Sequence, residues 1–76
     1  MDNWQERIGI NPEIRFGKPC IEGTRITVGD ILAWLSQEMT QGEIVVDFPE
    51  LEQRDILAAL AYASRLEETT RILATA

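Results

Sequence analysis

Residues 17–27, with the sequence GKPCIEGTRIT, form the densest run of special-purpose residues in this chain, among them a lysine, the cysteine, an arginine and two threonines. Gly17 and Lys18 resemble the end of a phosphate-binding loop, in which glycine backbone N–H groups surround the phosphates and a Ser or Thr follows the lysine. The comparison fails, because Pro12 occupies the place of that motif's first glycine and Pro19 follows the lysine. We therefore expect residues 17–27 to form a shaped turn that leads into a helix.

Cys20 is the single cysteine, and the chain contains no histidine. A reactive thiol usually depends on a neighbouring base or cation, and without histidine we exclude zinc sites, Ser-His-Asp triads and Cys-His pairs. Cys20 lies between Pro19 and Ile21, which is typical of a small buried apolar residue. The adjacent carboxylates of Glu67 and Glu68 diverge on a helix and imply no pocket. We expect no enzymatic activity, no cofactor and no metal.

Two polar side chains of the same segment have a structural interpretation. Thr24 is expected to bond to local backbone, as hydroxyl side chains do in turns. Arg25 is expected to pair with a carboxylate from the helices that follow. These two contacts would explain the Gly-Thr-Arg string of residues 23–25 without any ligand.

The composition describes one small domain whose second part is acidic. A folded chain of 76 residues buries only about 60% of the surface that its unfolded form exposes, so support from a partner chain or from self-association is expected. The net charge is −6. Through Thr27, four basic residues balance four acidic ones, whereas three basic residues face nine acidic ones afterwards. Such a surface repels phosphate backbones and suits a basic protein partner.

We expect a cytoplasmic protein without membrane association. No apolar run approaches the roughly 18 residues of a spanning helix, and the polar N-terminus lacks a signal-peptide core. The single domain, residues 1–76, divides into a polar lead with a small β element and the Gly-Thr-Arg loop (residues 1–27), and a helical core (residues 28–76).

The N-terminal part favours a small, irregular β element. Short alternating or extended stretches are predicted at residues 7–10, 14–16, 20–21 and 25–26. Ile21 and Ile26 are expected to point inward.

The first helix has clear start signals. Thr27 as N-cap and Asp30 three residues later form a capping-box pair, and the carboxylate is also favoured near the positive end of the helix dipole. One apolar face follows at helical spacing: Val28, Ile31, Leu32 and Leu35. Trp34 lies at the edge of this face, where two interpretations stay open: the margin of the core, or a partner contact. The helix is expected to end at residues 38–39.

A second, short helix starts at Thr40, with Glu43 at the capping-box position. Its apolar set is Ile44, Val45 and Phe48, and Pro49 enforces the stop. The third helix is predicted from about Gln53 toward the C-terminus. Its core face is expected to contain Ile56, Leu57 and Leu60.

A second apolar stripe follows on the third helix, rotated away from the first: Tyr62, Leu66, Thr69 and Leu73. Either Tyr62 and Leu66 complete the domain's own core, or the stripe packs on another subunit, where tyrosine is a favoured anchor. The second interpretation predicts a homodimer that Leu66→Glu would convert to a monomer.

Three helices of these lengths favour a mainly α fold with a helix-turn-helix or homeodomain-like core. A helix that reads the major groove needs cationic or amide side chains in its first turns. Only Gln53 and Arg54 fit this requirement, and three carboxylates oppose them: Glu50, Glu52 and Asp55.

Better candidates for DNA contact are Arg15, Lys18 and Arg25 on the N-terminal element. The competing interpretation is a solvated face, balanced by Glu13 and Glu22. Any DNA affinity is therefore expected to be low and steeply salt-dependent.

The string G-K-P-x-I-x-G-T-R-I from Gly17 resembles the prokaryotic family catalogued as domain of unknown function 433. Residues 11–14, 44–51 and 58–63 are also similar, and the resemblance extends from about Ile8 to Tyr62. It implies a small helix-turn-helix-like protein of a kind often regarded as an antitoxin, encoded beside a PIN-like nuclease toxin.

Two positions depart from that pattern. Family members often have a basic residue where Glu22 stands, and they usually have Thr or Ser at Glu52. A missing hydroxyl cap at Glu52 would cost about 1 kcal/mol of helix stability.

The resemblance and the acidic helices together favour an acidic protein-binding module that holds a nuclease-type toxin inactive. Covering the basic substrate groove of the toxin is the mode of inhibition that this charge suggests. Two alternatives stay open. One is a DNA-binding transcriptional regulator, acting in one version as its own repressor. The other is a purely structural dimer subunit without a toxin partner.

Overall fold

Three α-helices follow a small N-terminal β element in this computed structural model, which describes the backbone of residues 3–75 and the side chains of residues 3–67. The elements in order are η1 (Trp4–Arg7), β1 (Ile8–Gly9), η2 (Arg15–Gly17), β2 (Cys20–Ile21), α1 (Val28–Ser36), α2 (Gln41–Asp47) and α3 (Gln53–Thr75). The predicted mainly α fold with a short N-terminal β element is confirmed.

The β element is a two-stranded antiparallel sheet in which Ile8 pairs with Ile21 and Gly9 with Cys20. The predicted strand at residues 20–21 is confirmed, whereas the one at residues 7–10 shortens to two residues because Arg7 belongs to η1. The chain then turns back, and the Ile21 N–H donates to the Ile26 carbonyl at 2.9 Å.

Residues 14–16 are not the alternating strand that their pattern predicted. Arg15, Phe16 and Gly17 have φ angles of 51°, 59° and 80°, all in the left-handed region. Such a turn costs a glycine little, but a residue with a β-carbon is strained there. The side-chain pattern could not show this, because alternation describes which faces are apolar and carries no information on the sign of φ.

Both predicted capping boxes are confirmed. The Asp30 N–H donates to the Thr27 hydroxyl at 2.8 Å, and the Thr27 N–H donates to the Asp30 carboxylate at 3.1 Å. Thr40 and Glu43 repeat the arrangement at the start of α2, with distances of 2.9 and 3.1 Å. The hydrogen bond from the Thr40 N–H lowers the pKa of the Glu43 carboxyl.

Helix α1 ends two residues earlier than predicted, at Ser36. The Met39 N–H donates to the Trp34 carbonyl at 3.2 Å, and the Glu38 N–H donates to the Leu35 carbonyl at 3.1 Å. This pair of bonds is the Schellman motif, in which the residue after the cap is left-handed. Glu38, with φ 70°, occupies that position, where glycine is the usual residue.

The hydrophobic core lies between β2 and the three helices. Its fully buried large side chains are Ile31, Ile44, Leu51 and Ile56. Ile21 and Ile26 point into it as predicted, and Leu32, Leu35, Val45 and Phe48 pack against it.

The predicted core face of α3 is partly wrong. Ile56 is buried, but Leu57 is 52% exposed and Leu60 is 38% exposed, while Ala58 and Ala59 are buried. At 100° per residue, the buried face is centred near Ala59, and Leu57 lies well away from it. Helix α3 packs against η1 and α1. Small alanines permit this close approach, so the tertiary packing selects the alanine face over the leucine face.

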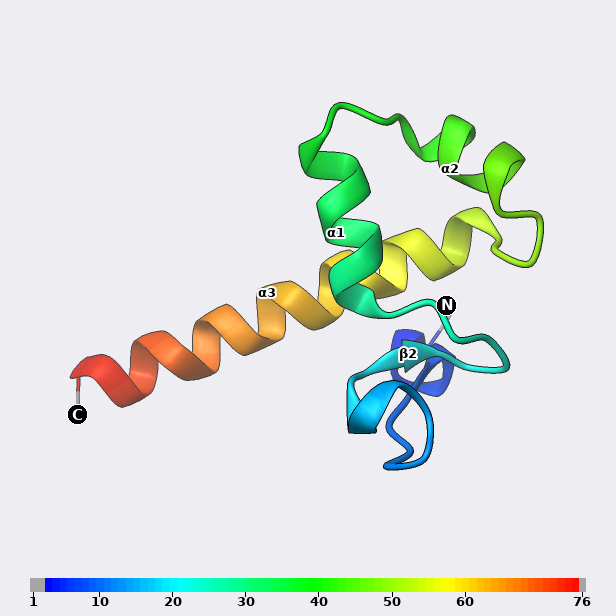
Figure 1. Cartoon of the computed structure of the whole chain (residues 1–76). Coiled ribbons are helices and arrows are strands. Elements are labelled where there is room, and N and C mark those ends of the chain that lie inside the picture. Colours follow the sequence, from blue (N-terminus) through cyan, green and yellow to red (C-terminus); the bar gives the residue numbers. More distant parts are fainter. Residues whose placement is uncertain (1–2, 76) are drawn as a thin grey trace.

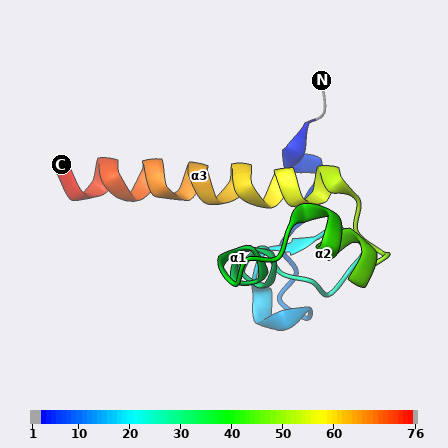
Figure 2. The same ribbon diagram turned by 90° about the horizontal axis from the view of Figure 1, so that it is seen from above.

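Helix α3 projects far beyond the rest of the domain (Figures 1 and 2). Its first turns cross α1 and lie beside η1 and α2, whereas its C-terminal turns extend away from every other element. Among the described residues, the C-terminal turns of this helix therefore have no neighbouring element to cover them.

Candidate binding surfaces

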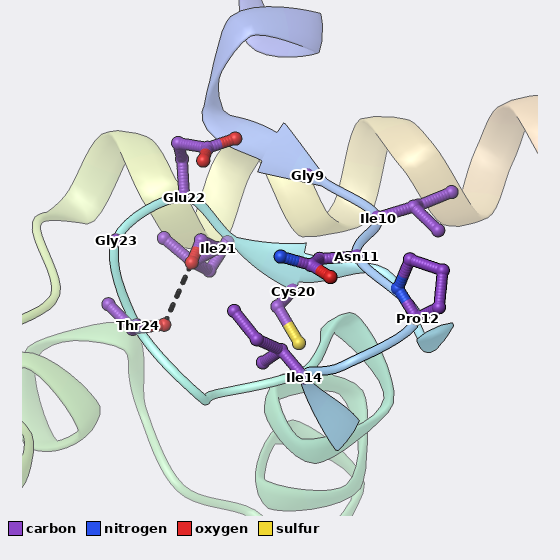
Figure 3. Close-up of a pocket in the computed structure, with 10 residues that line it drawn as sticks. All are labelled: Gly9, Ile10, Asn11, Pro12, Ile14, Cys20, Ile21, Glu22, Gly23 and Thr24. Atoms are coloured by element: carbon purple, nitrogen blue, oxygen red, sulfur yellow. Dashed lines mark hydrogen bonds between the residues drawn. The ribbon is translucent and has the colours of Figure 1, made fainter. Parts of the chain in front are cut away.

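A pocket of about 300 Å³ lies between the loop after β1 and the turn after β2 (Figure 3). Its lining is Gly9, Ile10, Asn11, Pro12, Ile14, Cys20, Ile21, Glu22, Gly23 and Thr24. The Cys20 sulfur faces Ile14 in this pocket and donates to the Lys18 carbonyl at 3.3 Å. Cys20 is itself 5% exposed, as expected for a small apolar residue.

Thr24 fixes the turn that closes the pocket, as predicted. Its hydroxyl donates to the Ile21 carbonyl at 2.9 Å and accepts from the Ile26 N–H at 3.0 Å. Gly23, with φ 81°, supplies the left-handed residue that the turn requires. The Gly-Thr-Arg string therefore serves the local backbone first.

The expected ion pair of Arg25 with a helix carboxylate is made instead by Arg15. The Arg15 guanidinium donates to the Asp30 carboxylate at 3.0 Å and to the Arg25 carbonyl at 2.9 Å. Arg15 reaches Asp30 because its own backbone is left-handed, which no side-chain pattern showed. Of the candidates for DNA contact, Arg15 is thus occupied within the fold.

These contacts also determine the ionisation of Asp30. Partial burial raises the pKa of its carboxyl, but hydrogen bonds from Thr27 and Arg15, together with the charge of Arg15, outweigh that effect. The net pKa lies below the ordinary value of 3.8. Asp30 therefore links the capping box of α1 to the turn that contains Arg15.

Lys18 and Arg25 are exposed, and within residues 3–67 their side chains form no ion pair or hydrogen bond. Gln53 and Arg54, the other candidates, lie at the start of α3 and are exposed. The Gln53 amide donates to the Gln41 side chain at 3.3 Å, which ties it to α2. The structure thus does not bring the five candidate residues onto one surface.

Trp34 is half-buried and stacks on Phe48, with ring centroids 4.1 Å apart and planes 9° from parallel. This contact joins α1 to the end of α2, so Trp34 has a structural role at the margin of the core. Tyr62 also packs against the core, and its ring meets the edge of Trp4 at 6.3 Å.

Leu66 is the member of the predicted second stripe that stays open to solvent, with 50% of its surface exposed. It follows Ala59 by seven positions and Tyr62 by four, which places all three on one helical face. We call Ala59, Tyr62 and Leu66 the Leu66 face. Tyr62 and Leu66 therefore continue the face that α3 buries. The stripe was predicted to lie away from the core because the core face was assigned to Ile56, Leu57 and Leu60. The side chains of Thr69 and Leu73 lie outside the described residues.

Two features were missed by the sequence analysis. Phe16, in the left-handed turn, is 96% exposed. A hollow of about 200 Å³ lies where α2 meets α3, lined by Gln41, Gly42, Val45 and Gln53. In the sequence, the only signal for the exposed Phe16 was an aromatic residue directly before Gly17 in a short turn. The hollow between α2 and α3 arises from tertiary packing alone.

Among the described residues, no group of three acidic, histidine or cysteine side chains is arranged to hold a metal ion. Within the same part of the chain, none of the helices has both the length and the apolar character needed to span a bilayer.

Fold and surfaces together define a small, mainly α-helical domain with a two-stranded N-terminal sheet and one protruding helix. The family described as "Protein of unknown function (DUF433)" matches residues 8–63, and the chain belongs to this family. It is similar to the crystal structure of a DUF433 member protein from Anabaena variabilis ATCC 29413, with 31% sequence identity and a TM-score of 0.77. That similarity covers 92% of this chain and 70% of the other. No protein with a curated description matches.

Proposed function

We propose that this protein is a protein-binding module of the antitoxin type, which holds a PIN-like nuclease toxin inactive. The observation that carries the proposal is the Leu66 face of α3, the helix whose C-terminal turns extend past the domain body (Figure 2). Leu66 is half exposed on this face although its helical neighbours Ala59 and Tyr62 pack against the core. An apolar helical face of this kind is suited to lie in a groove of a partner protein.

The charge distribution supports a basic partner. After Thr27 the chain has nine acidic and three basic residues. Four of the acidic side chains, Glu43 and Asp47 on α2 and Glu50 and Glu52 just before α3, are exposed. A nuclease binds phosphates with a basic groove, and an acidic module can compete with the phosphates for it. The nuclease identity of the partner comes from the family resemblance.

The test is a mild affinity purification of the tagged chain from its native cells, with partners identified by mass spectrometry. We expect a small nuclease-like protein in near-equal molar amount, whose activity the purified chain suppresses. Leu66→Glu should abolish its recovery, because a charge on the Leu66 face would be buried unpaired in the complex.

Leu57→Glu is the matched control. Leu57 is 52% exposed and Leu66 is 50% exposed, and the nine positions between them place them on opposite sides of α3. Recovery of the partner should survive Leu57→Glu. Equal loss with both variants, or no stoichiometric partner with the native chain, would reject the proposal.

The alternative is a DNA-binding regulator, favoured by the exposed Lys18 and Arg25, whose side chains have no partner among the described residues. The residues just before α3 oppose it, because Glu50 and Glu52 are exposed there and would repel phosphates. A mobility-shift assay on the upstream DNA at several salt concentrations distinguishes the two. Tight binding that is lost in Lys18→Ala together with Arg25→Ala would favour the regulator.

A further inference from the structure

Phe16 combines two features that stability alone does not explain: a strained backbone and an almost completely exposed ring. Its φ is 59° and its exposed fraction is 96%. A left-handed conformation costs a residue with a β-carbon about 1–2 kcal/mol, and an exposed ring recovers none of this by burial. Strained residues of this kind concentrate where they present a group to a ligand or partner.

The turn that carries Phe16, residues 14–18, is braced against the domain. Arg15 is held by the Asp30 carboxylate at 3.0 Å and the Arg25 carbonyl at 2.9 Å, and the Gly17 N–H donates to the Ile14 carbonyl at 3.1 Å. The ring is therefore presented from a rigid loop, so that little conformational entropy is lost when it enters a partner. We call residues 14–18 the Phe16 turn.

The same chain carries a surface of the opposite shape and charge. The hollow between α2 and α3 has a volume of about 200 Å³ and includes Val45 and Gly42. A cavity of roughly 150 Å³ accommodates a benzene ring. The same stretch of chain contains four exposed acidic residues and no basic residue between positions 41 and 52: Glu43, Asp47, Glu50 and Glu52. We call residues 41–53 the α2 corner.

Charge favours contact between the two surfaces. Residues 11–26 contain three basic and two acidic side chains, a net charge of +1, whereas residues 41–52 have a net charge of −4. The side chains of Lys18 and Arg25 have no partner among the described residues. Lys18 is close to Phe16 in the chain, and Arg25 is held near it because its carbonyl accepts a hydrogen bond from Arg15. Val46 on the outer side of α2, 78% exposed, adds apolar area to the α2 corner.

We infer that the Phe16 turn of one copy docks its ring into the α2 corner of a second copy. Figure 1 shows η2 below α3 and α2 above it, so the two segments lie on different sides of this helix in that view. The contact is therefore heterologous: each molecule offers one ring and one hollow, and copies join head to tail. A small interface of this type gives a transient, concentration-dependent assembly. This inference does not depend on the toxin partner, because the Leu66 face is not part of the contact.

The experiment is sedimentation velocity or light scattering of the full chain over a concentration series. The weight-average mass should rise above the monomer value of 8.6 kDa without a plateau at the dimer, and should fall as salt is added. Phe16→Gly should weaken the association about tenfold or more, because the anchor is lost while the left-handed turn is retained. Phe16→Asn is a second anchor-less variant, since asparagine also tolerates this conformation.

Gly42→Leu should have the same effect from the other side. A β-carbon at Gly42 meets nothing closer than the Thr40 hydroxyl at 3.9 Å, so a leucine fits the fold and fills the hollow. Each variant alone should be monomeric. When the two variants are mixed, the Phe16→Gly chain supplies an open hollow and the Gly42→Leu chain supplies a ring. They should form a one-to-one heterodimer that grows no further, because neither chain has a second working surface.

Three results would overturn the inference. One is a native chain that stays monomeric over the whole concentration series. Another is a Phe16→Gly chain that keeps the native mass distribution; if this variant also loses binding to a fluorescent single-stranded oligonucleotide, the ring is assigned to base stacking instead. The third is a mixture of the two variants that remains monomeric.

Discussion

Replacing Phe16 by glycine should stabilise the protein. The left-handed backbone costs about 1–2 kcal/mol at a residue with a β-carbon, and glycine removes that cost. Glycine also makes the unfolded chain more flexible, which takes back about 0.4–1 kcal/mol. Because the ring is 96% exposed, its loss removes almost no buried area. The net gain is about 1 kcal/mol, which for a domain of this size corresponds to a rise in Tm of about 4–8 °C.

The assay is thermal unfolding followed by circular dichroism, at low protein concentration so that self-association does not contribute. Phe16→Ala is the matched control: it removes the ring but keeps the β-carbon and the strain, so its stability should stay within about 0.5 kcal/mol of the native chain. A Phe16→Gly chain less stable than the native one would refute the reasoning, because the ring would then make contacts that stabilise the fold. Equal gains in both variants would show that the ring itself, and not the backbone, is unfavourable.

Three further substitutions test the local structure by chemical denaturation. Glu38→Gly should stabilise α1 by about 1 kcal/mol, because Glu38 occupies the left-handed position of the Schellman motif with φ 70°; no change would mean that its strain is compensated elsewhere. Glu52→Thr should raise the free energy of unfolding by about 0.5–1 kcal/mol, since the Glu52 N–H already donates to the Asp55 carboxylate at 2.8 Å and a hydroxyl would complete the capping box. A loss of stability would show that the ion pair of Glu52 with Arg7 outweighs the cap. Asp30→Asn should cost about 1–2 kcal/mol at neutral pH. The pKa of Asp30 is lower in the folded state, so the carboxylate contributes fully to folding stability above the ordinary value of 3.8, and this contribution is lost as pH falls through the folded pKa. If Asp30→Asn loses stability at acid pH in the same way as the native chain, this reasoning is contradicted.

Helix starts could be predicted because their interactions are local. Thr27 with Asp30 and Thr40 with Glu43 lie three residues apart, so the capping boxes depend on little beyond the helix itself. The motif around Gly17 predicted the family as well, since a resemblance depends only on the order of residues.

The face that α3 buries could not be predicted. Leucines at positions 57 and 60 and alanines at positions 58 and 59 both fit a helical period, and hydrophobicity alone favours the leucines. The close approach of neighbouring elements favours the alanines instead. For the same reason, the sequence showed Tyr62 and Leu66 as an apolar stripe but predicted that the stripe lies away from the core, whereas Tyr62 packs against it.

By itself, the sequence determined the starts of the first two helices with their capping boxes and the acidic character of the second half, because each depends on composition or on contacts within about four residues. Only the tertiary structure decided that Arg15 pairs with Asp30, that Arg7 pairs with Asp55 at 3.0 Å across 48 positions, and that Phe16 is left exposed. These features depend on where distant segments meet and on the backbone angles that bring them there. Side-chain periodicity carries no information about either.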